Sequence, residues 1–331
     1  MLSHRPERLE KHQLGEIKNL ILKVFWCFLG FLLCSCKPIN QGYSRLTSAE
    51  GTADSSALSV SLQNRRQSIE LWAERCGLSV AKESCDVGDA ALFNGLMCLS
   101  GDPMSCEAVR RSQGSDGRMW RAEYRIAADA VNSFSRDMAI GVLAYLVATK
   151  DRQLAGRWMA WIEENDFRLC RETSDNRCDF TPGFWMLFRE VWEHIGLLPT
   201  ERMRTAFLDE SVMALLQAHF SPAGYQLHLA GVNVLLRRHM GQKTSTINSL
   251  AESLAERQPL NPFFAFIARG ANHDVVDKTL NWCPSNQPAS RTQWSFERDF
   301  RNEPWIQSMG WECLMLINFL LRDLKENNEV R

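Results

Sequence analysis

Three stretches of the chain bring carboxylates, arginines and tryptophans close enough together to carry chemistry. The first has the sequence QGSDGRMWR and places Asp116, Arg118 and Trp120 at alternate positions. Gly114 and Gly117 permit tight turns, so we expect a loop that displays the polar side chains. Asp116 is a candidate general acid or base, Arg118 a candidate for binding an acidic group, and Trp120 a candidate for stacking on a sugar ring. A plain surface loop with a half-buried tryptophan is the structural alternative.

The second stretch is NSFSRDM, in which Arg136 and Asp137 follow Ser135 at an expected helix start. Arg136 is a candidate for holding a carboxylate, and Asp137 is a candidate catalytic carboxylate that positions a water. The alternative is structural. Asp137 would then only complement the helix dipole, worth about 0.3–1 kcal/mol, and Arg136 would form an ordinary ion pair.

The third stretch lies late in the chain, where Glu297 and Arg298 stand between Trp294 and Trp305. Two charges flanked by aromatic rings are typical of a loop that binds a sugar or an acid. The alternative is a long clasp that plugs one end of the helical array.

Several catalytic motifs are absent from the sequence, which narrows the chemistry. There is no GxSxG nucleophile elbow, no Walker A or GxGxxG phosphate loop and no HExxH metal motif. His194, His228 and His239 are expected to be surface or core groups and not metal ligands. We therefore expect neither a metal nor a cofactor.

The N-terminal region carries a targeting signal. Lys18 and Lys23 precede the apolar run Val24–Leu33, and small residues then lead to Cys36. Ten apolar residues are too few to cross a bilayer, which needs about 20. The sequence LCSC resembles the lipobox of bacterial lipoproteins. That resemblance implies that residues 1–35 are a signal peptide and that Cys36 is lipidated.

The long n-region, with Glu7, Glu10 and Glu16, leaves two other interpretations open. Translation starts further in, or a cytoplasmic tail precedes an uncleaved anchor. The lipobox resemblance implies a lipid-anchored protein of the cell envelope. Lys37, where lipoproteins kept at the inner membrane often carry Asp, favours the periplasmic face of the outer membrane if the host is Gram-negative.

Eight of the eleven cysteines follow Cys36, and an even number in an exported chain is typical of disulfides. Many pairings are possible, but short spacings favour local bridges. Zinc binding is the alternative, and the absence of CxxC pairs disfavours it. The expected pairs are Cys76–Cys85, Cys98–Cys106, Cys170–Cys178 and Cys283–Cys313.

Composition and periodicity predict a folded, all-α protein. The chain has 45% hydrophobic residues and a formal net charge of −1, so no field would gather nucleic acid or anionic lipid. Residues 36–58 are rich in small polar side chains and are expected to be a flexible tether. Residues 59–331 are expected to form a single all-α domain.

Helical periodicity and capping signals place the expected elements. Apolar residues fill 90–99, and helices are expected to begin after Ser135, Asp151 and Thr181. Short connections predict an array of antiparallel helical hairpins. Further helices are expected near 201–218, 224–240, 245–257, 262–269, 272–282 and 305–325.

The stretches GDAALFNGLMCLSG, SDGRMWR and SRDMAIGVLAYLVATKD resemble the repeats of six-hairpin (α/α) toroid proteins, which include unsaturated glucuronyl hydrolases and polysaccharide lyases. The resemblance covers residues 88–151 and implies an (α/α) toroid, complete or partial, that acts on acidic sugars. It implies catalytic roles for Asp116 and Asp137 and binding roles for Arg118, Trp120 and Arg136. Two departures stand against it: the domain is short for six full hairpins, and no Tyr-His pair of the lyase kind is evident.

Three functions compete at this point. The first is a glycoside hydrolase or polysaccharide lyase of the envelope, with paired carboxylates on an acidic glycan. The second is a non-catalytic envelope lipoprotein that binds a glycan or an envelope protein. The third is an accessory factor for secretion or assembly without a small-molecule site.

Overall fold

The computed structural model describes residues 50–72, 75–76, 79–80, 90–126, 134–171, 176–204, 221–222, 224–285 and 313–329. The chain divides into two compact units, Met1–Ala49 and Glu50–Arg331, and the described residues all belong to the second. The predicted signal peptide, the predicted lipidation site Cys36, and the candidates Trp294, Glu297, Arg298 and Trp305 lie outside the described residues.

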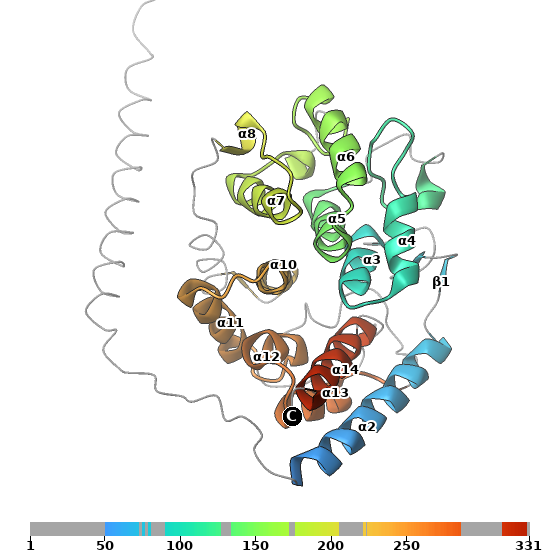
Figure 1. The fold of residues 1–331 in the computed structure, drawn as a ribbon, viewed down its shortest axis with the longest axis vertical. Helices are drawn as coiled ribbons and strands as arrows, with labels where there is room; N and C mark the ends of the chain where they lie inside the picture. The colour runs from blue at the N-terminus through green and yellow to red at the C-terminus, as the bar shows by residue number, and fades with distance from the viewer. Residues whose placement is uncertain are drawn as a thin grey trace, which may run out of the picture. The chain divides into compact units, whose positions relative to one another are not determined.

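The described part is mostly helical, which confirms the all-α prediction (Figure 1). Two-residue antiparallel strands, β1 (Arg75–Cys76) and β2 (Ser79–Val80), and the short 3-10 turns η1 (Glu123–Arg125) and η2 (Asn176–Cys178) accompany the helices. No described helix is long and apolar enough to cross a membrane. The helices are α2 (Glu50–Trp72), α3 (Ala90–Leu99), α4 (Pro103–Arg111), α5 (Arg136–Thr149), α6 (Arg152–Glu164), α7 (Pro182–His194), α8 (Glu201–Arg204), α10 (Tyr225–His239), α11 (Ser245–Arg257), α12 (Pro262–Arg269), α13 (His273–Trp282) and α14 (Cys313–Glu329).

The predicted helix starts are confirmed at three N-caps. Ser135 is the N-cap of α5. The Asp151 carboxylate accepts a hydrogen bond from the Leu154 amide at the start of α6, and the Thr181 hydroxyl accepts one from the Phe184 amide at the start of α7. The Asp151 and Thr181 side chains satisfy amide groups that the first turn of a helix leaves without a backbone acceptor, whereas the Ser135 side chain makes no such hydrogen bond.

The start of the helical unit differs from the prediction. Helix α2 begins at Glu50, so residues 50–58, expected to be tether, are helical. Small residues such as Ala and Ser tolerate a helix, and tertiary contacts decide whether it forms. Here Leu62 and Ile69 are fully buried where α2 packs against α13 and α14.

Helices α3 and α5 make the most extensive contact among the described elements. A Cβ atom on Gly95 would lie 1.8 Å from the Gly141 carbonyl oxygen, and a Cβ on Gly141 would lie 2.1 Å from the Ala91 carbonyl oxygen. The two backbones therefore touch directly, and no side chain larger than hydrogen fits at either position.

An aromatic cluster joins α6 to α7. Trp158 is fully buried, and its ring lies 5.1 Å from Phe188 and 6.4 Å from Trp192, between ring centroids. Phe188 and Trp192 stack at 4.4 Å on successive turns of α7. Phe134, just before α5, meets Trp158 edge-on, so the cluster fixes the start of α5 against the next hairpin.

A buried ion pair joins α7 to α10. The guanidinium of Arg237 contacts both carboxylate oxygens of Glu190 at 3.1 Å. Burial raises the pKa of Glu190, and the charge of Arg237 partly opposes that effect. Removing one partner of such a pair would leave the other charge buried and unpaired, which is strongly destabilising. The pair therefore fixes the register of the two helices.

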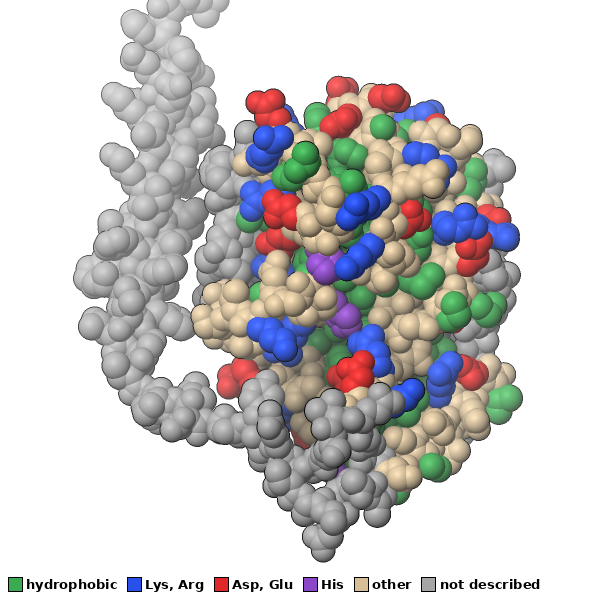
Figure 2. Space-filling model, viewed as in Figure 1, with side chains coloured by type: hydrophobic (Ala, Val, Ile, Leu, Met, Phe, Trp, Pro, Cys, Tyr) green, Lys and Arg blue, Asp and Glu red, His purple; other side chains and the backbone are tan. Residues whose placement is uncertain are grey.

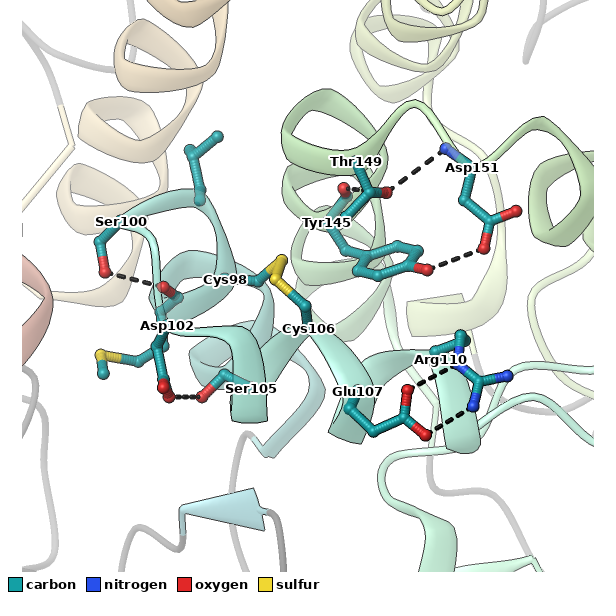
Figure 3. The surroundings of a disulfide bond; sticks show 12 residues. Cys98, Ser100, Asp102, Ser105, Cys106, Glu107, Arg110, Tyr145, Thr149 and Asp151 are labelled. Atoms are coloured by element: carbon teal, nitrogen blue, oxygen red, sulfur yellow. Dashed lines mark hydrogen bonds and ion pairs between the residues drawn. A yellow bond between two sulfur atoms is a disulfide. The ribbon is translucent and has the colours of Figure 1, made fainter.

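The Cys98–Cys106 disulfide closes the turn between α3 and α4 (Figure 3). Beside it, the Tyr145 hydroxyl donates to Asp151 at 2.8 Å, and burial raises the pKa of Tyr145. Hydrogen bonds from Arg110 and then Arg111 lower the pKa of Glu107 to about 2. The turn between α3 and α4 is thus held by the disulfide and accompanied by hydrogen bonds of neighbouring side chains.

Several connections between the described helices are short. Those that follow α3, α5, α7, α10, α11 and α12 span only 100–102, 150–151, 195–200, 240–244, 258–261 and 270–272. The segments that lead into α5 and α7, 112–135 and 165–181, are longer, and each includes residues outside the described ranges. The first two candidate stretches fall in the segment before α5 or at the start of that helix.

We expect Gly141→Ala to lower the free energy of unfolding by about 3 kcal/mol, because the added methyl forces α3 and α5 apart. Gly156→Ala is the matched control, since Gly156 is exposed in the middle of α6 and a Cβ there meets nothing within 4 Å. That change should raise stability by about 0.5–1 kcal/mol through helix propensity. Urea unfolding followed by circular dichroism measures both, and equal effects would contradict the close contact.

Candidate functional site

The loop of residues 113–121, here the Asp116 loop, is held by its own backbone. The Gly114 amide donates to the Arg118 carbonyl at 2.8 Å, and the Gly117 amide donates to the Gly114 carbonyl at 3.0 Å. One Asp116 oxygen accepts from the Arg118 amide at 3.1 Å. Gly117 has a φ of 90°, which disfavours any other residue there.

The Asp116 loop is also fixed on α6. A Cβ on Gly117 would lie 2.5 Å from the Arg157 carbonyl oxygen. The Gln113 side-chain amide donates to the carbonyls of Gly117 and Leu154, at 3.1 and 3.0 Å. The Asp116 loop is therefore held firmly against α6.

Arg118 and Trp120, predicted as ligand-binding groups, contact one another. The guanidinium carbon of Arg118 lies 4.1 Å from the centre of the Trp120 ring and 5.6 Å from that of Trp161. Arg118 is 5% exposed and Trp120 9% exposed. Cation–π contacts of this kind stabilise a loop, and here they occupy the ring faces that a sugar would need.

The Cys170–Cys178 disulfide closes a second loop. The Leu169 amide donates to the Cys178 carbonyl at 2.9 Å, and Arg168 forms an ion pair with Asp179 at 3.2 Å. Arg171, from this loop, reaches the second oxygen of Asp116 at 3.2 Å. The Arg171 side chain is 63% exposed and that of Asp116 44% exposed.

The second candidate stretch meets the same disulfide loop. Arg136 donates through Nη1 to the backbone carbonyls of Asn176 and Asp179, at 2.6 and 2.8 Å. Asp137 is half-buried in the first turn of α5. The structure thus attaches Asp116 and Arg136, from two separate candidate stretches, to one loop.

The disulfide prediction is confirmed for three of the four pairs, Cys98–Cys106, Cys170–Cys178 and Cys283–Cys313. These six thiols are therefore not zinc ligands. The Cys76–Cys85 pair stays a prediction, because Cys85 lies outside the described residues. Within the described ranges, no group of three or more His, Cys, Asp or Glu side chains is arranged to hold a metal ion.

No model of a known protein family matches the chain, and comparison with curated proteins and with solved structures gives no significant match. The resemblance to six-hairpin toroid proteins therefore rests on the three quoted stretches alone.

Sequence reasoning missed Arg171 as a site residue. The signal was present, because Arg171 directly follows a cysteine predicted to close a short loop, and such loops display their polar side chains. The sequence did not reveal which residue Arg171 contacts, because Asp116 lies 55 positions away.

Charges of both signs are interspersed over the face of the molecule seen in Figure 2. No large patch of one sign occupies that face, in agreement with the net charge of −1. Recognition of a charged ligand would thus depend on individual side chains and not on a long-range field.

The two local disulfides allow a matched test. Both close loops with a sequence separation of 8, so chain entropy alone predicts the same loss, about 2.5 kcal/mol, when either is removed. We expect Cys170→Ser with Cys178→Ser to cost more than Cys98→Ser with Cys106→Ser, because the contacts of Arg136 and Arg171 also depend on that loop. Denaturant unfolding of the two double variants measures the difference, and equal losses would show that these contacts contribute nothing.

Proposed function

We propose that the chain is a lipid-anchored protein of the bacterial cell envelope whose helical domain binds an acidic glycan without cleaving it. The anchor would be Cys36. The binding surface would lie on the end of the helical array where the Asp116 loop and the Cys170–Cys178 loop meet.

We also infer that the helices close into an (α/α) toroid. Helix α5 contacts α3, α7 and α10, and α10 contacts α12. The last helix, α14, contacts both α2 and α3, at the other end of the chain. Helices joined by two or three residues, such as α3 with α4, α5 with α6 and α12 with α13, are expected to run antiparallel, as the hairpins of a toroid do.

The observation that carries the proposal is the exposed ion pair between Arg171 and Asp116. An exposed pair contributes only about 0–1 kcal/mol, so a ligand carboxylate can replace Asp116 at little cost. A guanidinium binds a carboxylate through two parallel hydrogen bonds. The Cys170–Cys178 disulfide restrains the backbone beside Arg171, which lowers the entropy lost on binding.

The contacts of Asp116 favour a role in binding over a role in catalysis. One of its oxygens accepts from the Arg118 amide and the other contacts Arg171. A general acid must present its carboxyl group to the leaving oxygen, whereas both oxygens of Asp116 already contact other groups of the protein. Arg136, proposed for substrate binding, donates to two backbone carbonyls instead.

We expect Arg171→Met to weaken binding of a fluorescent uronate oligosaccharide about tenfold or more, the loss typical of a charge-assisted pair. Arg269→Met is the matched control: Arg269 forms an exposed pair with Asp274 at 3.0 Å, with side chains 45% and 50% exposed. Fluorescence anisotropy with the full chain in detergent gives both affinities. Equal affinities for the two variants would reject Arg171 as the binding group.

The same samples separate binding from catalysis. Asp116→Asn should keep or improve affinity, because it releases Arg171 from a competing carboxylate. Mass spectrometry should find no cleaved product from acidic polysaccharides or peptidoglycan. Product formation that is lost in Asp116→Asn or Asp137→Asn would restore the hydrolase or lyase hypothesis.

The anchor is tested separately. We expect the protein from a bacterial host to carry a diacylglyceryl group on Cys36 and to sediment with membranes, and Cys36→Ser to lose that mass. Intact-protein mass spectrometry and fractionation measure both properties. A protein that keeps residues 1–35 and lacks the lipid would favour the uncleaved anchor.

A further inference from the structure

His239 is the last residue of α10, and its ring makes a hydrogen bond on each side. Nδ1 lies 2.9 Å from the Leu235 carbonyl oxygen, and Nε2 lies 3.0 Å from Nη2 of Arg322 on α14. A carbonyl only accepts and a guanidinium only donates. The geometry therefore admits one form of the imidazole, which is neutral with its proton on Nδ1.

Arg322 connects this histidine to a third helix. Its Nη1 donates to the carbonyl of Leu99, the last residue of α3, at 3.4 Å. Its guanidinium carbon also lies 5.1 Å from the centre of the Phe319 ring, and the His239 ring lies 5.3 Å from the same ring. One guanidinium thus joins the ends of α10 and α3 to α14.

We propose that His239 and Arg322 form an acid-sensitive latch that holds α14 in the helical array. When Nε2 takes a second proton, it no longer accepts from Arg322, and an N–H then faces an N–H across 3.0 Å. The proton comes from solvent and no covalent bond changes. Helix α14 loosens from α10 and α3. This inference does not depend on the proposed function.

The charges that act on His239 both come from α14: Arg322 disfavours its protonation and Glu326 favours it. Asp323 lies 3.7 Å from Arg322. The α3 groups at this point, Leu99 and Ser100, do not titrate, and neither does Phe266 of α12, which stacks on Phe319.

Burial lowers the pKa of His239, the Leu235 hydrogen bond opposes this, and Arg322 lowers it further. Because the folded-state pKa lies below the unfolded value of about 6.5, the unfolded chain binds more protons between the two values. The contribution to stability is therefore complete above about pH 6.5 and is lost as the pH falls through the folded-state pKa.

Burial raises the pKa of Asp323, so the titration of this carboxyl changes stability with pH in the opposite direction. A variant that removes only the titration of His239 isolates its share. His239→Gln does so, because an amide oxygen accepts from Arg322 and does not titrate.

The experiment is hydrogen–deuterium exchange of the full chain in detergent at about pH 7.5 and about pH 5.5, read by mass spectrometry and corrected for the intrinsic pH dependence of exchange. In the wild type we expect peptides of α14 to lose about tenfold in protection at the lower pH. In His239→Gln that loss should disappear. His194→Gln is the matched control, since His194 also has its pKa lowered by burial but lies at the end of α7.

Each outcome decides the matter. Equal pH dependence in the wild type and His239→Gln, or its loss in His194→Gln, overturns the latch. If His239→Gln does not fold, Arg322→Met provides the test: α14 should then be weakly protected at both pH values. Strong protection that still falls with acid in Arg322→Met would also overturn it.

Discussion

The fold depends on the direct backbone contact between α3 and α5. Gly95 and Gly141 leave no space for a side chain, so the two helices lie at a fixed separation. Helix α5 also contacts α4, α7 and α10. Its first residue, Arg136, holds the loop that ends at Asp179. A shift of this helix pair would therefore be carried to the candidate site, since Gly141 lies on the same helix as Arg136 and Asp137.

Several arginines cap the ends of neighbouring helices. The last carbonyl groups of a helix accept no hydrogen bond from within that helix, and they attract positive charge. Arg322 donates to Leu99 at the end of α3, Arg152 to Ile195 at the end of α7, Arg238 to Ile267 near the end of α12, and Arg65 to Cys283 after α13. Each of these arginines comes from a neighbouring helix, so it also fixes one helix against another.

Local signals were predictable from the sequence and long-range contacts were not. The apolar run 90–99, the N-caps before α5, α6 and α7, and the short cysteine spacings each reflect interactions within a few residues. Helix α4 was missed because its buried residues are small (Ser105, Ala108 and Val109), although Asp102-Pro103 is a cap-then-proline signal. The ion pair of Arg171 with Asp116 and the hydrogen bond of Arg136 to Asp179 span 55 and 43 positions. Such contacts follow only from the packing of whole hairpins, so the candidate residues were found but their partners were not.

The candidate arginines differ in their surroundings. Arg118 is 5% exposed and lies between tryptophan rings, so turning it toward a ligand would disrupt a buried contact. Arg136 donates to two backbone carbonyls of residues that are themselves exposed. Arg171 faces water, and its carboxylate partner is itself half exposed, so exchanging that partner for a ligand carboxylate leaves no buried group unpaired. An exposed and weakly paired guanidinium of this kind fits the proposed reversible binding of an anion.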